Sequence, residues 1–276
     1  MSVEGGHWYR RDGSPCYEVP TKAGGVRAVN LRWDRRLNLV PSVTTALRVV
    51  AKPALERWKC EQHALAAITL PRIDGETSDQ LMRRIAEDAA AQSKAAAEEG
   101  TRIHDAIECA FKGQAYPHKY KNHVDAAMQR IGELFPGVHD WVAEEYFAHP
   151  LGYGGKTDLH SPSTGIVIDY KGKDGELWQD DVHAYAKAIG KDGEPCDKRC
   201  DYDQNIQLAA YQRGLRLRHN VCANLFVSRT HPGHIAHKVW SRDEVAYGLA
   251  YFDAALALWK IAHKYESSFT TEREAA

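Results

Sequence analysis

Long apolar segments are missing from this sequence of 276 residues. No hydrophobic run approaches the roughly 20 residues that a membrane-spanning helix needs. The first seven residues, MSVEGGH, hold no apolar stretch of the kind found in a signal peptide. We therefore expect a soluble intracellular protein that has no membrane partner.

Cysteine is scarce and scattered, which excludes a disulfide scaffold at this length. The closest pair, Cys196 and Cys200, has no further zinc or iron–sulfur ligands at a suitable spacing nearby. We expect six reduced thiols, at Cys16, Cys60, Cys109, Cys196, Cys200 and Cys222.

An excess of charge of either sign is also missing, since the formal net charge is −1. This balance does not indicate nucleic-acid binding, and it does not exclude it either, because acids gathered at a metal site offset basic residues elsewhere. What the sequence does contain is a hydrophobic content of 43%, which permits one large domain or two small domains with a real core.

Short strands and helices are predicted for the N-terminal part of the chain. Residues 7–40 carry alternating apolar residues and a turn signal at Asp12 and Gly13. Ser42 can cap a short helix, and Pro53 suits the first position of another helix.

An alanine-rich stretch then predicts a long helix from Ser78 towards Phe111, interrupted at Gly100. Glycine inside a helix costs about 1 kcal/mol relative to alanine, so it usually marks a break or a close backbone approach. After the glycine, apolar residues at helical spacing form one stripe, and His104 and Glu108 lie one turn apart at its edge.

The second half of the chain is predicted to contain three strands, a helix, two strands and a last helix, in that order. The stretch 172–200 is polar and poor in aliphatic residues, so we expect a long loop there with a short helix near residues 182–189. Ser241 and Glu244 form a capping-box signature that opens the last helix. The other expected elements are strands at residues 141–148, 153–160, 166–171, 221–228 and 234–240, and a helix at residues 203–217.

Asp169, Tyr170 and Lys171 end a short apolar run and form the most informative feature of the sequence. Alternate side chains of a strand share a face, so Asp169 and Lys171 project together while Tyr170 points the other way. Asp158, eleven residues earlier, is expected on an adjacent strand. Two acids beside an ammonium suit a hard cation and a polarised water, and that chemistry hydrolyses phosphodiesters.

Four motifs occur in an order that is typical of one group of proteins. They are Gly100–His104 (GTRIH), Gly155–Asp158 (GKTD), Asp169–Lys171 (DYK) and Gln207–Tyr211 (QLAAY). They fall in turn on a predicted helix, strand, strand and helix. With these motifs, residues 100–228 resemble the RecB-like exonucleases of the PD-(D/E)XK superfamily, which include phage recombination exonucleases and CRISPR-associated RecB-like nucleases.

The resemblance implies an α/β fold with a restriction-endonuclease-like core, in which a mixed β-sheet is flanked by helices. The stretch 172–202 is longer than the family's minimal form, which leaves room for a substrate-shaping insertion. The expected divisions are an N-terminal helical and hairpin elaboration at residues 1–77, the nuclease core at residues 78–266 and a flexible tail at residues 267–276.

A metal site is implied as well. Asp158 and Asp169 offer carboxylate oxygens, which are the ligands that Mg²⁺ and Mn²⁺ prefer. By resemblance, the carbonyl of Tyr170 and the imidazole of His104 complete the protein's share of the shell, and the nitrogen ligand favours Mn²⁺ somewhat while tolerating Mg²⁺. Three side chains far apart in the sequence are therefore expected to converge on one divalent ion.

Lys171, Gln207 and Tyr211 are expected to act beside that ion. Lys171 would hold the attacking water and offset charge on the pentacovalent phosphorus. Gln207 and Tyr211 are four residues apart and so share one helical face. By resemblance this face covers the metal, where the amide and the phenol orient Lys171 or contact the DNA backbone.

Three glutamates stay open as additional members of the site. Glu108 and one of Glu144 or Glu145 could support the ligands or hold a second metal. Alternation along the strand does not decide between Glu144 and Glu145.

The implied function is metal-dependent DNA exonuclease activity in phage or bacterial recombination or repair, in the cytoplasm of a bacterial host cell. DNA is the expected partner, together with a phage single-strand annealing or recombination protein. Polarity, strand preference and oligomeric state are left open. Two alternatives are a structure-selective endonuclease on the same core and a catalytically silent DNA-binding recombination partner. The intact set of two acids and a lysine argues against the silent alternative, because burying such charges without a metal is costly.

Overall fold

The computed structural model describes residues 7–21, 24–29, 37–51, 53–189 and 193–266. The predicted tail at residues 267–276 lies outside these residues. A five-stranded mixed sheet lies at the centre, in the order β12-β11-β7-β6-β5. Its strands are β5 (Val142–His149), β6 (Tyr153–His160), β7 (Val167–Lys173), β11 (Cys222–Ser228) and β12 (Ile235–Trp240). Neighbours run antiparallel except β7 and β11, which run parallel.

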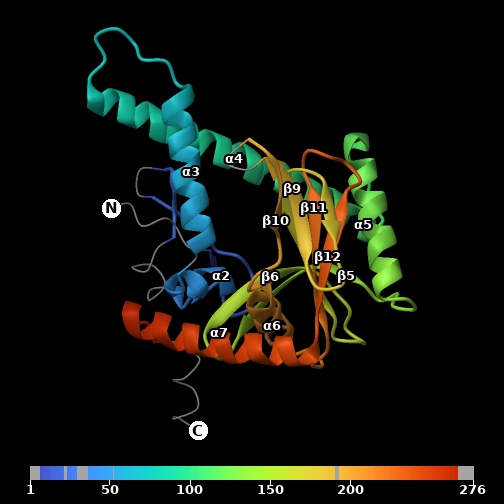
Figure 1. Ribbon diagram of the computed structural model, residues 1–276. Coiled ribbons are helices and arrows are strands. Elements are labelled where there is room, and N and C mark those ends of the chain that lie inside the picture. Colours follow the sequence, from blue (N-terminus) through green and yellow to red (C-terminus); the bar gives the residue numbers. More distant parts are fainter. Residues whose placement is uncertain (1–6, 22–23, 30–36, 52, 190–192, 267–276) are drawn as a thin grey trace.

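Helices flank both faces of this sheet (Figure 1). On one face, α4 (Ser78–Phe111) and α5 (Lys121–Leu134) pack against Ile168 and its neighbours. On the other face, α6 (Gln204–Gly214) and α7 (Arg242–His263) share a core that includes Val167. Because β7 and β11 are covered on both faces, Val167 and Ile168 at the start of β7 and most residues of β11 are buried and apolar. The predicted α/β class, a mixed sheet flanked by helices, is confirmed.

The N-terminal segment packs into the same core. Ser42 caps α2 by accepting a hydrogen bond from the Thr45 N–H, and Pro53 is the first residue of α3, as predicted. Trp8 and Leu39 are buried in the core beneath α6 and α7. The elements are β1 (Trp8–Tyr9), β2 (Glu18–Pro20), β3 (Val26–Ala28), β4 (Val40–Pro41), α2 (Val43–Ala46), η1 (Leu47–Val49) and α3 (Pro53–Thr69), with η2 (His118–Tyr120) before α5.

Residues 172–200 contradict the prediction of a loop with a short helix. They form a three-stranded antiparallel sheet in the order β10-β9-β8, and the predicted helix is strand β9. Ala184 and Ala186 alternate inward onto Phe226 of the main sheet, so packing outweighs the helical preference of an alanine-rich segment. The bounds are β8 (Leu177–Gln179), β9 (Ala184–Ile189) and β10 (Pro195–Arg199).

Two helical features also differ from expectation. Helix α4 is continuous through Gly100, and no atom lies within 4 Å of where a Cβ of Gly100 would be. The glycine therefore marks neither a break nor a close approach, and the fully buried Ile103 and Ile107 stabilise the turns that follow it. Helix α5 is an addition that the sequence patterns do not predict. The capping box of α7 is confirmed, with Ser241 and Glu244 each accepting a backbone hydrogen bond.

Replacing Gly214 by alanine should lower the free energy of unfolding by about 1–3 kcal/mol, because overpacking a filled core costs this much. The added methyl would lie 2.1 Å from Cε2 of Phe147, which is buried beneath α6. The matched change Gly132→Ala, in α5 with open space around it, should raise the free energy by roughly 0.5–1 kcal/mol. Urea denaturation measures both, and equal stability of the two variants would contradict the close packing of α6 on β5.

Candidate functional site

The candidate site lies where β6 and β7 part. The two strands pair at Leu159↔Ile168 and His160↔Val167, and the ladder ends there. Beyond that point the Tyr170 N–H donates to the side-chain Oδ2 of Asp158 at 2.8 Å and not to the backbone of β6. An extended residue turns its N–H and C=O to the same side, so the Tyr170 carbonyl faces the same opening.

Asp169 is held by three neighbouring side chains. It is 3% exposed, and the ammonium of Lys171 lies 2.8 Å from Oδ2 and 3.0 Å from Oδ1. The Gln207 amide donates to Oδ1 at 3.2 Å, and the Asn224 amide donates to Oδ2 at 2.8 Å. The carboxylate is thereby fixed in orientation before any ligand binds.

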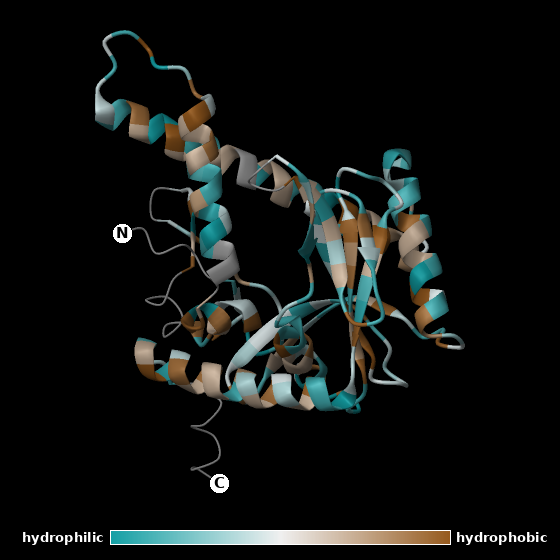
Figure 2. Cartoon of the chain, viewed as in Figure 1, coloured by the Kyte–Doolittle hydropathy of each residue, from teal (hydrophilic) through white to brown (hydrophobic). Residues whose placement is uncertain are grey.

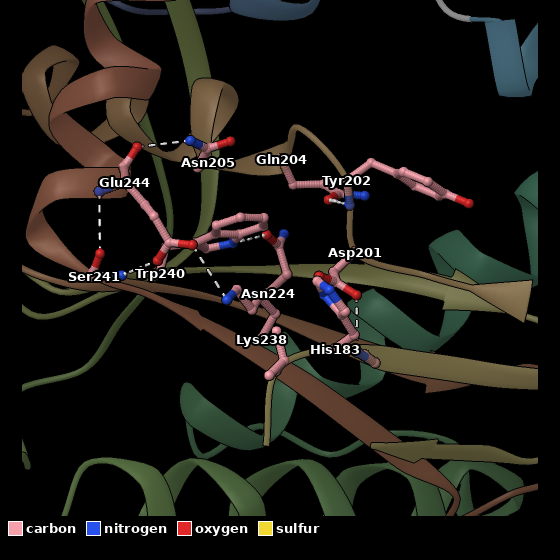
Figure 3. A network of polar contacts seen from close by, with 12 residues as sticks. His183, Asp201, Tyr202, Gln204, Asn205, Asn224, Lys238, Trp240, Ser241 and Glu244 are labelled. Carbon is pink, nitrogen blue, oxygen red and sulfur yellow. Dashed lines mark hydrogen bonds and ion pairs between the residues drawn. The ribbon is translucent and has the colours of Figure 1, made fainter. Parts of the chain in front are cut away.

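Asn224 is a site residue that the sequence motifs do not reveal. It lies beside Asp169 in the parallel pairing of β7 and β11, and it is fully buried. Its Oδ1 accepts a 2.8 Å hydrogen bond from the Trp240 indole (Figure 3). This bond fixes the amide so that Nδ2 donates to Asp169. The available signal is a single amide inside the otherwise apolar strand CANLFVS.

His104 approaches from α4 on the other side of the opening. Its Nδ1 lies 3.8 Å from Oδ2 of Asp158, and its ring meets the Tyr170 ring edge-on at 5.6 Å. Its Nε2 is buried without a hydrogen-bond partner. Burial lowers the pKa of His104 to about 4, against the opposing pull of Asp169, so the imidazole is neutral near pH 7. A neutral imidazole with an unused nitrogen is competent to bind a metal.

Helix α6 supplies Gln207 and Tyr211, which share one face as predicted. The Gln207 oxygen accepts from Lys171 at 3.2 Å, and its nitrogen donates to the Tyr211 hydroxyl at 2.7 Å. A Cβ on Gly155 would lie 2.9 Å from the Tyr211 ring and 2.8 Å from the ring of Phe147, so glycine on β6 lets the helix come this close. One amide therefore links the lysine, the acid and the phenol.

Burial is the largest single influence on the pKa of Asp158, Asp169 and Lys171. It raises the pKa of Asp158, and it raises the pKa of Asp169 although Lys171 opposes this. Burial also disfavours the ammonium of Lys171, but the adjacent Asp169 carboxylate outweighs this and raises the pKa of Lys171. The raised pKa favours the protonated ammonium of Lys171 as a hydrogen-bond donor near neutral pH.

The structure distinguishes the two glutamates of β5. Glu144 lies between the pairs Ala143↔Leu159 and Glu145↔Thr157, and so opposite Asp158, and it forms an ion pair with Lys156. Its φ of 55° is in the left-handed region, a strained conformation that tends to occur at functional sites.

Glu145 and Glu108 are placed differently from Glu144. Glu145 is half exposed and lies 3.2 Å from His160. Glu108 forms an ion pair with Lys112 and adds to the negative charge around Asp158.

The donor set fits a divalent cation that prefers oxygen. The buried carboxylate of Asp169, the partly buried carboxylate of Asp158, a backbone carbonyl and the unpartnered imidazole nitrogen are all ligand types for Mg²⁺ or Mn²⁺. Within the part of the chain that the structure describes, no three His, Cys, Asp or Glu side chains already form a compact metal-holding group. In this arrangement the Lys171 ammonium balances the charge of Asp169.

All seven residues expected from the sequence are thus brought to one place: His104, Asp158, Asp169, Tyr170, Lys171, Gln207 and Tyr211. No protein-family model matches the chain, and no curated protein matches it. The arrangement of the site therefore rests on the chain's own residues.

Replacing Asn224 by alanine should lower the free energy of unfolding by about 1–3 kcal/mol, because the Trp240 indole and Oδ2 of Asp169 each lose a buried hydrogen bond. The control Asn122→Ala, at an exposed position of α5, should change it by less than about 0.5 kcal/mol. Chemical denaturation of both variants measures the difference. Equal stabilities of the two variants would show that the hydrogen bonds of Asn224 do not contribute to the free energy of unfolding.

Proposed function

We propose that this protein is a metal-dependent deoxyribonuclease that hydrolyses DNA phosphodiester bonds, and that it acts as an exonuclease. The observation that carries the proposal is the joining of Asp158, Asp169 and Lys171 to the unpartnered His104 imidazole at the parting of two strands. These residues belong to three of the four motifs that resemble the RecB-like exonucleases. A restriction-endonuclease-like core is part of the same proposal.

Each residue has a role that follows from its contacts. Asp158, Asp169, the Tyr170 carbonyl and His104 would hold Mg²⁺ or Mn²⁺, which when bound supplies positive charge at the phosphate and lowers the pKa of water. Lys171, fixed by Asp169 and Gln207, donates to the attacking water and to a phosphate oxygen.

Tyr211 keeps the Gln207 amide turned towards Lys171, because its hydroxyl accepts from the amide nitrogen. In-line attack of water on the phosphorus, with its proton released to solvent, would break the P–O3′ bond. The O3′ leaving group would take a proton from solvent, and a 5′-phosphate would remain.

The proposed setting is phage or bacterial recombination or repair in the cytoplasm of a bacterial host cell. DNA is the substrate, and a phage single-strand annealing or recombination protein is the proposed partner. These assignments rest on the resemblance of the motifs and on the chemistry of the site.

Linear and covalently closed circular DNA, each incubated with Mg²⁺, test the proposed reaction. We expect linear DNA to shorten from its ends while the closed circle stays intact, because an exonuclease needs a terminus. Asp169→Ala protein prepared in the same way should leave both substrates intact. Opening of the circle would identify an endonuclease, and equal digestion by the variant would identify a contaminant.

Lys171→Ala should reduce DNA hydrolysis by about 10²–10⁴-fold, because it removes a donor to the charge that develops in the transition state. Its affinity for Mn²⁺ should stay within a few-fold of that of the parent, because lysine is not a ligand. Lys187→Ala, which removes an exposed lysine of β9, is the control and should leave both quantities unchanged. Isothermal titration and a nuclease assay measure them, and loss of Mn²⁺ binding would contradict the assigned role.

Asp158→Asn should leave the metal-free protein at least as stable as the parent near neutral pH. Burial raises the pKa of Asp158 above its unfolded value. The protonated carboxyl is therefore compatible with the fold at low pH, and stability is lost as pH rises through the folded pKa and the carboxylate ionises. Mn²⁺ should raise the melting temperature of the parent and not that of the variant, because only the parent keeps both carboxylate ligands.

The control for Asp158→Asn is Asp140→Asn. Hydrogen bonds from Ser161 and Ser163 lower the pKa of Asp140 to about 2, so its ionised form stabilises the fold above the unfolded pKa, and this contribution is lost as pH falls through the folded pKa. The substitution should therefore lower the melting temperature near neutral pH. Thermal melts with EDTA and with Mn²⁺ compare the two variants, and a destabilised metal-free Asp158→Asn would contradict the account.

A further inference from the structure

The outward face of helix α7 is largely apolar between residues 246 and 262. Tyr247 is 67% exposed, Tyr251 36%, Leu258 53% and Ile261 76%. The remaining exposed positions between residues 245 and 262 are Ala246, Ala250, Asp253, Ala254, Ala257 and Ala262. Asp253 is the one charged residue among them, and it is paired with Arg213 at 2.7 Å.

This face differs from that of an ordinary surface helix. The opposite side of α7 is already used, since Val245, Phe252 and Trp259 are buried in the core shared with α6. A helix of this kind usually presents charged residues to water, whereas α7 is apolar on both sides. Exposed apolar surface of this extent indicates a contact with another molecule.

By length and composition α7 is also the one helix among the described residues that could cross a bilayer, with 33% of the tested window buried. A single helix of this kind carries little weight, because helices of a soluble core pass the same test. Its inner side is part of the main core.

The spacing of the exposed residues indicates a helical partner. Positions 247, 251, 254, 258 and 261 are separated by four, three, four and three residues, which is the repeat of a helix–helix seam. A 22-residue helix is about 33 Å long. Two such faces packed together would bury several hundred Å² on each side, approaching the roughly 800 Å² per partner of a standard interface.

The face is complementary to itself when two copies run antiparallel about Ala254. Positions equidistant from that alanine then face each other across the two-fold axis. Leu258 lies opposite Ala250 and Tyr251 lies opposite Ala257, so these large side chains meet small ones, while Tyr247 lies opposite Ile261 towards the ends of the contact. The small Ala254 on the axis lets the two helices approach closely, as self-complementary contacts of this symmetry require.

Charge along α7 favours the same orientation. The first turn carries Arg242, Asp243 and Glu244, and Lys264 follows the last turn. Antiparallel packing about Ala254 sets Glu244 of one helix level with Lys264 of the other and aligns the two helix dipoles favourably. Parallel packing would place like charges together.

We propose that the protein forms a two-fold symmetric dimer through antiparallel contact of α7 with α7 of a second copy. This does not depend on the proposed nuclease activity. Helix α7 packs directly on α6, where Asn205 donates to the Glu244 carbonyl at 2.7 Å and Gly248 allows close approach (Figure 3). Helix α7 therefore lies between the proposed dimer contact and the helix that carries Gln207. Figure 2 shows the apolar residues distributed along α7.

Sedimentation equilibrium of the full chain from about 1 to 50 µM tests this proposal, since dimer mass depends on concentration. We expect the parent to approach twice 30.9 kDa. Ala254→Glu should weaken the dimer at least about tenfold, because it buries two unpaired carboxylates at the axis. Ala67→Glu, at an exposed alanine of α3, is the matched control and should stay dimeric. Circular dichroism of both variants confirms that they are folded.

Oxidation of Ala254→Cys tests the orientation, because a residue on the axis meets its own copy and can form a symmetric disulfide. Ala67→Cys, which carries the same native cysteines, should not cross-link above the parent. A monomeric parent would overturn the proposal, and so would a dimer that Ala254→Glu leaves intact or one without the Ala254→Cys cross-link. A parent that floats as a monomer with vesicles of phosphatidylcholine and phosphatidylglycerol would overturn it in favour of a membrane surface.

Discussion

The constraint on which the site depends is the gathering of three charged groups at one point, with the Asp169 carboxylate buried and the Asp158 carboxylate and Lys171 ammonium partly buried. Charges removed from water cost several kcal/mol each unless they are paired or coordinated. Asp158 meets this demand by accepting from a backbone N–H that the parting strands release, and Asp169 meets it with Lys171, Gln207 and Asn224. The raised pKa of each aspartate shows that burial still dominates without a cation. A divalent ion bound between the two aspartates would offset the free-energy cost of their negative charge.

The fold serves this constraint from three directions. Helix α4 carries His104 to the edge of β6, strand β11 sets Asn224 beside Asp169, and helix α6 lowers Gln207 onto Lys171. Each approach depends on a position outside the site. Gly155 removes the side chain that would hold α6 away, and the Trp240 indole keeps the Asn224 amide turned the right way. Residues outside the site therefore hold the side chains of the site in position, and such support is needed to fix a functional geometry.

Local sequence patterns correctly predict those strands and helices whose apolar and polar residues follow the spacing of the element. The strands around Asp158 and Asp169 and the face shared by Gln207 and Tyr211 follow from alternation and helical spacing. The three-stranded sheet at residues 177–199 does not, because Ala184 and Ala186 become strand residues only through packing on Phe226. Asn224 could not be predicted either, since its partners Asp169 and Trp240 are distant in the sequence and meet it only through strand pairing.

The continuity of helix α4 through Gly100 is also a result of tertiary packing. A local preference of about 1 kcal/mol against glycine is outweighed by the burial of Ile103 and Ile107 in the following turns. The left-handed Glu144 opposite Asp158 is a further feature of this kind, because backbone strain leaves no mark in residue type. Tertiary contacts therefore decide the features on which site geometry depends, while sequence motifs identify the residues involved.

The most direct measurement of the central claim is an anomalous difference map from a crystal of the protein soaked in Mn²⁺. The account predicts one peak about 2 Å from a carboxylate oxygen of Asp158 and of Asp169, with the Tyr170 carbonyl and the His104 imidazole completing the shell. A peak elsewhere, or a map without a peak at saturating Mn²⁺, would contradict it.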